Sequence, residues 1–241
     1  MKTKNQTNEK WPGFHAGVLT IAITLFLLHS TDSIPQPPIN MHGVSFNESW
    51  ALLKNDDGIA LYERWISAEG FPACRQMGIE FMLRGDLEAV TRVVTDDAMA
   101  ADWMTAIKSY QILNHVNDSC WYSYTLYDIP WPLKKQEVII QNTFLEDPDR
   151  KSITVTMIAN AQYIPENKGI SRVSHMMAKW TFTEASKGYV QVQYTMFSGQ
   201  RSPFPRWLTD PIIQGNLVKT MKNFRRTAED IFSLSKTYTR Q

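Results

Sequence analysis

The chain has 241 residues, of which 43% are hydrophobic, and it contains eight Trp, nine Tyr and eleven Phe. This composition is typical of a folded domain with a sizeable core and excludes a disordered chain. The formal net charge is only +1 and the Lys and Arg residues do not gather in one region, so the composition excludes a typical nucleic-acid-binding protein.

The N-terminal segment has the pattern of an export signal. Three lysines fall among the first ten residues, an apolar run follows at residues 16–28, and a Pro-rich stretch comes soon after. An apolar run of this length is shorter than the ~20 residues that span a bilayer as a helix. We therefore expect residues 1–33 to be a secretory signal peptide, with an uncleaved membrane anchor as the alternative, and residues 34–45 to be a linker. The protein is then exported, either to a periplasm or out of the cell.

The next elements are predicted to be one short helix and two strands. Asn47 or Ser49 can cap a helix that ends at Asp57-Gly58. Strands are predicted over residues 59–66 and 75–84. In the second of these, apolar and polar residues alternate, which indicates a sheet with one buried face.

Strands dominate the middle of the chain. A helix is first expected after Gly85-Asp86, because apolar residues recur there three or four apart. Six strands, separated by short polar turns, are then predicted at residues 108–115, 119–128, 136–145, 152–159, 173–183 and 189–198. Since parallel neighbours need long crossover connections, short turns predict an antiparallel meander.

The chain closes with a predicted amphipathic helix. Asp210 is expected to be its N-cap and Pro211 its first residue, where the missing N–H costs nothing. Apolar residues then recur along one face, at Ile213, Leu217, Met221, Phe224, Ala228 and Ile231. The predicted fold class is α+β, with a curved antiparallel sheet wrapped around this long C-terminal helix.

Space between such a sheet and helix is filled either by large side chains or by a ligand. The inward-facing residues are expected to be mostly apolar with a few neutral polar groups, the usual composition of a small-molecule site. The candidates for ligand contact are Tyr124, Asn142, Trp180, Tyr194, Met196, Leu217 and Met221. The same residues also suit a plain core, and the pattern alone leaves both interpretations open.

Signals of catalysis are weak in this sequence. His42, His115 and His175 are scattered, and no His-x-x-His, Cys-x-x-Cys, His-Glu-x-x-His, Gly-x-Ser-x-Gly or phosphate-binding loop occurs. We therefore expect no catalytic residue, no metal and no cofactor. Cys74 and Cys120 are either a disulfide pair or two small buried hydrophobic residues, and the sequence does not decide between the two.

Two loops and the order of the elements resemble the START lipid-transfer domains. The loop DIPWPLKKQE at residues 128–137 resembles a Trp-Pro loop of that family, and PENKGISR at residues 165–172 resembles its Pro-Glu-x-x-Gly-x-x-Arg turn. Trp103 lies where these domains keep a Trp, and the last helix is similar to their lid helix. The resemblance places one such domain at residues 46–236, in a single-domain, exported member of the bacterial type.

The resemblance implies a helix-grip fold whose apolar cavity holds one lipid, fatty-acyl or sterol-like molecule. It also implies a gate that touches a membrane surface, where the amphipathic ring of Trp is favoured. The residues of this gate would be Trp131, Pro132, Phe204, Trp207 and Leu208. A sterol in particular is not indicated, because sterol-binding members keep a buried acid and an Arg where this chain has neutral residues.

The protein is therefore predicted to bind one hydrophobic ligand and to act as a carrier that transfers it. It is expected to be a monomer that contacts membranes transiently. Two other classes of function stay open. One is a cyclase- or hydrolase-like enzyme of the same fold acting on a hydrophobic substrate, and the other is a lipid sensor that binds a partner protein.

Overall fold

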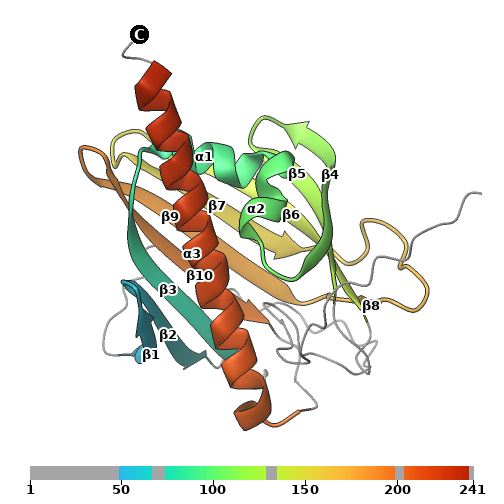
Figure 1. Cartoon of the computed structure of the whole chain (residues 1–241). Helices are drawn as coiled ribbons and strands as arrows, with labels where there is room; N and C mark the ends of the chain where they lie inside the picture. The colour runs from blue at the N-terminus through green and yellow to red at the C-terminus, as the bar shows by residue number, and fades with distance from the viewer. Residues whose placement is uncertain (1–48, 67–73, 129–134, 199–203, 239–241) are drawn as a thin grey trace, which may run out of the picture.

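Ten strands form one strongly curved sheet, and a long helix lies across its concave face (Figure 1). The computed structural model describes residues 49–66, 74–128, 135–198 and 204–238. The strands are β1 Ala51–Asp56, β2 Ile59–Ile66, β3 Cys74–Arg84, β4 Ile107–Asn117, β5 Cys120–Tyr127, β6 Gln136–Asp147, β7 Ser152–Ala159, β8 Ser171–Arg172, β9 Met176–Ser186 and β10 Tyr189–Ser198.

The sheet has the order β1-β2-β3-β10-β9-β7-β6-β5-β4, and all of these neighbours pair antiparallel. The two-residue strand β8 pairs parallel with β6 beside this path. The helices are α1 Leu87–Thr95, the 3-10 helix Asp97–Met99, α2 Ala100–Trp103 and α3 Arg206–Tyr238. The predicted α+β fold, a curved antiparallel sheet around a C-terminal helix, is confirmed.

The first predicted helix is wrong, since residues 51–56 form strand β1. Asp57 and Gly58 both have positive φ, at 59° and 73°, and Asp56 pairs directly with Ile59. Two central residues with positive φ make the type I′ turn that suits a two-residue hairpin, and Asp-Gly is one of its preferred sequences. The Asp-Gly pair is therefore the turn of a hairpin and not the end of a helix.

Helix α3 begins earlier than predicted. Its first turn starts after Pro205, whose carbonyl accepts from the backbone N–H of Leu208 and of Thr209 at 3.0 and 3.3 Å. The expected N-cap Asp210 instead accepts from Arg75 and Arg206, and Pro211 lies inside the helix. Asp210 thus lies inside the helix, where its carboxylate forms one long-range ion pair with Arg75 and one i,i+4 pair with Arg206, and the predicted helix start is wrong by about one turn.

The apolar stripe of α3 faces the sheet as predicted. Phe224 is fully buried, and its ring centroid lies 4.9 Å from that of Trp180, 5.8 Å from Phe182 and 5.3 Å from Trp103. These aromatic side chains form the centre of the main core, where β9, α2 and α3 meet. Packing of these large rings against one another stabilises the contact between the helix and the sheet.

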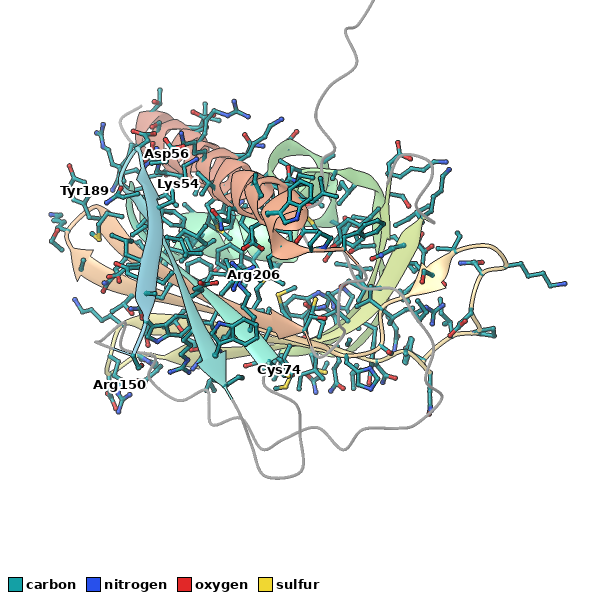
Figure 2. The ribbon with its side chains drawn as sticks, turned by 90° about the horizontal axis from the view of Figure 1, so that it is seen from below. Lys54, Asp56, Cys74, Arg150, Tyr189 and Arg206 are labelled. Atoms are coloured by element: carbon teal, nitrogen blue, oxygen red, sulfur yellow. The ribbon has the colours of Figure 1, made fainter. Side chains whose placement is uncertain are left out.

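Within the described residues, every ion pair between α3 and the sheet goes to β1–β3 or to the turn between β1 and β2. These pairs are Arg206–Glu63, Asp210–Arg75, Lys222–Asp56 and Arg225–Asp57. Figure 2 shows Lys54 and Asp56 of β1 beside the helix. On its other side, α3 contacts α2 through the Trp103–Phe224 ring contact, and it contacts the segment after α2 through a 2.7 Å hydrogen bond between the hydroxyls of Thr105 and Thr220. The two sides of the helix are thus held by different kinds of contact.

The expected signal peptide, the expected linker and the gate residues Trp131 and Pro132 lie outside the described residues. None of the helices in the described part has both the length and the apolar character that crossing a membrane requires.

Candidate ligand-binding cavity

A cavity of about 70 Å³ lies between the sheet, α2 and the middle of α3. One water molecule needs roughly 10–15 Å³, so the cavity holds several water-sized groups. All of its lining residues are uncharged. Most of the polar lining residues come from one part of the sheet and form a polar set, and apolar side chains of α3 and of the elements that face it form an apolar set.

The polar set comes from three adjacent strands, with Tyr110 on β4, Ser123, Thr125 and Tyr127 on β5, and Asn142 on β6. Successive side chains of a strand point to opposite faces, so residues 123, 125 and 127 share the inward face of β5. The Asn142 side-chain amide donates to the Ser123 hydroxyl at 2.9 Å and to the carbonyls of Trp121 and Ile140 at 3.4 and 3.3 Å. This network fixes the orientation of Asn142 in the cavity wall.

The apolar set consists of residues of α3 and of residues on the elements that face it. Its main members are Trp103, Met176, Trp180, Leu217 and Met221. Tyr194 on β10 lines the same space, and its ring centroid lies 4.5 Å from that of its cross-strand neighbour Trp180. Rings and thioethers of this kind form an adaptable hydrophobic surface.

The phenol groups of the cavity stay neutral at physiological pH. Burial raises the pKa of Tyr194. Burial also raises the pKa of Tyr127, with smaller contributions from Tyr194 and Tyr110, and the nearby Thr125 hydroxyl opposes this shift. The Tyr127 hydroxyl nevertheless has no hydrogen-bond partner of good geometry among the described residues. The cavity therefore contains neutral hydrogen-bonding groups and no fixed charge.

Five of the seven predicted contact residues line this cavity: Asn142, Trp180, Tyr194, Leu217 and Met221. Met196 is buried in the main core and is outside the lining. Tyr124 also lies outside it, because it occupies the opposite face of β5 from Ser123 and Thr125. Its hydroxyl donates to the Glu137 carboxylate at 2.9 Å.

Tyr124 belongs to a buried ionic cluster behind the cavity wall. Arg172 and Glu137 are 2% and 0% exposed, and the Arg172 guanidinium donates to the carboxylate through Nε at 3.0 Å and Nη2 at 2.7 Å. Asn167 donates to the same carboxylate from its backbone at 3.1 Å and from its side chain at 2.6 Å. Burial by itself raises the pKa of Glu137, but these donors outweigh it and hold the pKa below its usual value. The cluster fastens the turn at residues 165–172 to β6.

The predicted gate residues within the described part lie at the start of α3. Phe204 is half-buried, whereas Trp207 is 76% and Leu208 43% exposed. Trp65 at the end of β2 was not predicted for this surface, yet it is 55% exposed, and the Arg206 guanidinium lies 5.6 Å from its ring centroid. These side chains place apolar surface at the protein exterior beside the helix start.

Sequence reasoning missed most of the polar wall. Ser123, Thr125 and Tyr127 alternate with Tyr122, Tyr124 and Leu126, and the two faces of β5 have similar polarity. The alternation shows which residues share a face, but it does not tell which face is inward. Tyr110 and Thr105 gave no separate signal, because their place in the cavity depends on how α2 and β4 pack.

Cys74 and Cys120 are both free thiols and not a disulfide pair. Among the residues that the structure describes, no group of three or more His, Cys, Asp or Glu side chains could hold a metal ion.

The sequence pattern of the START domain family matches residues 48–230 of this chain. A protein of Pseudomonas aeruginosa, named only "Uncharacterized protein PA1579", is 26% identical over 187 residues, which cover 78% of this chain and 90% of that protein. These matches span nearly the whole of the described structure.

Solved structures of STAR-related lipid transfer proteins are also similar to this chain. A STAR-related lipid transfer protein fragment from Xanthomonas axonopodis is 26% identical with a TM-score of 0.65, and the match covers 75% of this chain and 99% of the fragment. Human StAR-related lipid transfer protein 5 has a TM-score of 0.63 at 12% identity, over 76% of this chain and 88% of that one. Human STARD10 has a TM-score of 0.62 at 14% identity, over 75% and 73% of the two chains. The two human structures are similar in fold.

Proposed function

This chain belongs to the START domain family, and we propose that it binds one hydrophobic ligand in the cavity beneath α3 and transfers it between membranes. The observation that carries the proposal is the cavity itself, which is enclosed by Trp180, Leu217 and Met221 on one side and by neutral polar groups on the other. The similarity to a bacterial STAR-related lipid transfer protein supports the same function.

Apolar burial supplies the driving force for capture. Each buried methylene group contributes about 0.8 kcal/mol, so an acyl segment of about ten methylenes gains about 8 kcal/mol before the entropic cost of binding. The cavity of about 70 Å³ is smaller than such a segment requires. A lipid therefore enters when α3 moves away from the sheet. The opening is expected on the side of α3 that faces α2, because no ion pair among the described residues holds the helix on that side.

The start of α3 is the proposed membrane contact. Trp207 and Leu208 are exposed there, and Trp65 adds a second exposed indole close to Arg206. Trp is favoured at the membrane interface because its ring is amphipathic, and Arg can contact lipid phosphates. We place this contact outside the cytoplasm, on the strength of the export signal expected at residues 1–33.

The first experiment is native mass spectrometry of the protein purified from its own host, followed by organic extraction. We expect one lipid molecule for each protein chain. The matched variant is Leu217→Trp, which fills the cavity from α3 and should abolish the bound lipid while the protein stays folded, since such overpacking costs about 1–3 kcal/mol.

The control variant is Leu234→Trp, because Leu234 lies on the same helix, is 60% exposed and is outside the cavity. It should retain the lipid of the parent protein. An empty parent protein that also takes up nothing from a mixed-lipid extract would contradict the proposed function and favour an enzyme of this fold.

A further inference from the structure

The lining of the cavity restricts the charge of whatever it holds. No Asp, Glu, Lys, Arg or His occurs among the lining residues in the described part of the chain. An ion moved from water into an apolar site without a counter-ion costs several kcal/mol, and here no lining side chain supplies the opposite charge. The enclosed part of the ligand is therefore uncharged.

The polar groups of the cavity show where the ligand's own polar group belongs. Most of them lie on β4–β6, whereas Trp180, Leu217 and Met221 form the apolar side. Several of these polar groups are already paired within the protein. Asn142 donates to Ser123, and Thr105 bonds to Thr220.

Tyr127 is the unpaired group on this polar side. It is 2% exposed, it shares the inward face of β5 with Ser123 and Thr125, and its hydroxyl has no hydrogen-bond partner of good geometry among the described residues. A second lining residue, Trp103, has an indole N–H that is also buried without a partner. Buried polar groups in native proteins are nearly always hydrogen-bonded, so two unpaired donors around one cavity indicate a missing acceptor.

We propose that the ligand is an uncharged lipid whose polar oxygen, a hydroxyl or a carbonyl, is seated inside the cavity against β4–β6 and accepts a hydrogen bond from Tyr127. This inference rests on the proposed function and names the ligand class for the same cavity. It excludes a lipid whose enclosed headgroup is an ionised carboxylate or phosphate.

The test compares two probes of equal chain length, tetradecan-1-ol and tetradecanoate, by their displacement of the uncharged fluorophore N-phenyl-1-naphthylamine from the full-length protein. At about pH 8 the alcohol should bind at least about tenfold more tightly, because the fatty acid is ionised there. At about pH 5 the preference should shrink, since a growing fraction of the fatty acid is then neutral.

Tyr127→Phe removes only the hydroxyl. We expect it to weaken binding of the alcohol about 3- to 10-fold, the effect of one net hydrogen bond. Its melting temperature should be equal to or above that of the parent, because an unpaired buried hydroxyl is removed. A purely structural role of Tyr127 would lower the melting temperature instead. The control is Tyr189→Phe, which removes the hydroxyl of an exposed tyrosine on β10, labelled in Figure 2.

Equal affinity for the alcohol and the acid at about pH 8, or an equal effect of Tyr127→Phe and Tyr189→Phe on alcohol binding, would overturn the inference and leave the binding function standing. Failure of the fluorophore and of both probes to bind at all overturns the proposed function, and the inference with it.

Discussion

Arg172→Met tests whether the buried cluster behind the cavity wall is needed to hold the turn at residues 165–172. In the parent protein, the Arg172 guanidinium donates to Glu137 and also to the backbone carbonyls of Ala161, Ile164 and Pro165, at 2.7 to 3.0 Å. Met fills a similar volume but donates no hydrogen bond. The substitution therefore leaves a buried carboxylate and three carbonyls without this partner.

Removing one partner of a buried ion pair costs about 3–5 kcal/mol, because the remaining charge stays buried. For a domain of this size, 1 kcal/mol corresponds to about 2–4 °C in melting temperature, so we expect a decrease of about 6–20 °C. The double variant Glu137→Gln/Arg172→Met should recover part of this loss, since it removes the uncompensated charge. Recovery stays incomplete because the three carbonyls still lack their donor.

The loss should also depend on pH. In the parent, the donors hold the pKa of Glu137 below its usual value, so the carboxylate contributes stability at neutral pH that is lost as pH falls through this lowered pKa. Without Arg172, burial acts against fewer donors and the pKa of Glu137 in the folded protein is higher than in the parent. Between the two pKa values the deficit grows with pH, so it should be larger at about pH 7 than at about pH 4.

Thermal unfolding followed by tryptophan fluorescence measures the change in melting temperature, and urea unfolding at both pH values measures how the free-energy loss depends on pH. Arg150→Met is the control, because Arg150 is 83% exposed and pairs with Asp147 at 3.6 Å on the surface (Figure 2). It should cost less than about 1 kcal/mol. A loss for Arg172→Met as small as that of the control, or one that is the same at both pH values, would refute the assigned role of the cluster.

Two further predictions concern the helix start and the thiols. Trp207→Ser should slow lipid transfer between vesicles about tenfold, because it removes apolar surface at the membrane. Leu234→Ser, at the other end of α3, is the control and should leave the transfer rate unchanged. Equal transfer rates for the two variants would argue against the proposed contact. Cys74 and Cys120 should both take up N-ethylmaleimide in unfolded, unreduced protein, giving two adducts by mass spectrometry, and a protein without adducts would mean that they pair.

Local patterns predicted most of the sheet because period-two alternation and short turns are properties of adjacent residues. The strand predicted at residues 136–145, for example, is β6, Gln136–Asp147. At the start of the described chain, strand β1 was predicted to be a helix, because Asp-Gly serves both as a helix end and as the type I′ turn of a hairpin such as β1–β2. Only the pairing of β1 with β2 decides between them.

The errors at α3 and in the cavity come from long-range contacts. Asp210 is a good helix cap by local rules, but Arg75, which is 135 residues away in the chain, engages its carboxylate. Tyr124 and Asn142 are equally suitable as neutral polar ligands of the cavity. Only Asn142 lines the cavity, because Tyr124 lies on the opposite face of the sheet. Which face of β5 and β6 points inward depends on how the sheet packs, and not on the local sequence.

The unequal attachment of α3 makes the domain sensitive to its ionic medium. The contacts with β1–β3 are ion pairs such as Arg206–Glu63 and Lys222–Asp56, several of them partly exposed, and dissolved salt screens charges over about 8–10 Å. The contacts with α2 are mainly apolar, and excluded salts such as sulfate strengthen burial of this kind. Raising the salt concentration therefore weakens the attachment of α3 to β1–β3 and does not weaken its attachment to α2. The composition of the surrounding solution, without any bound effector, biases which edge of α3 separates from the domain first.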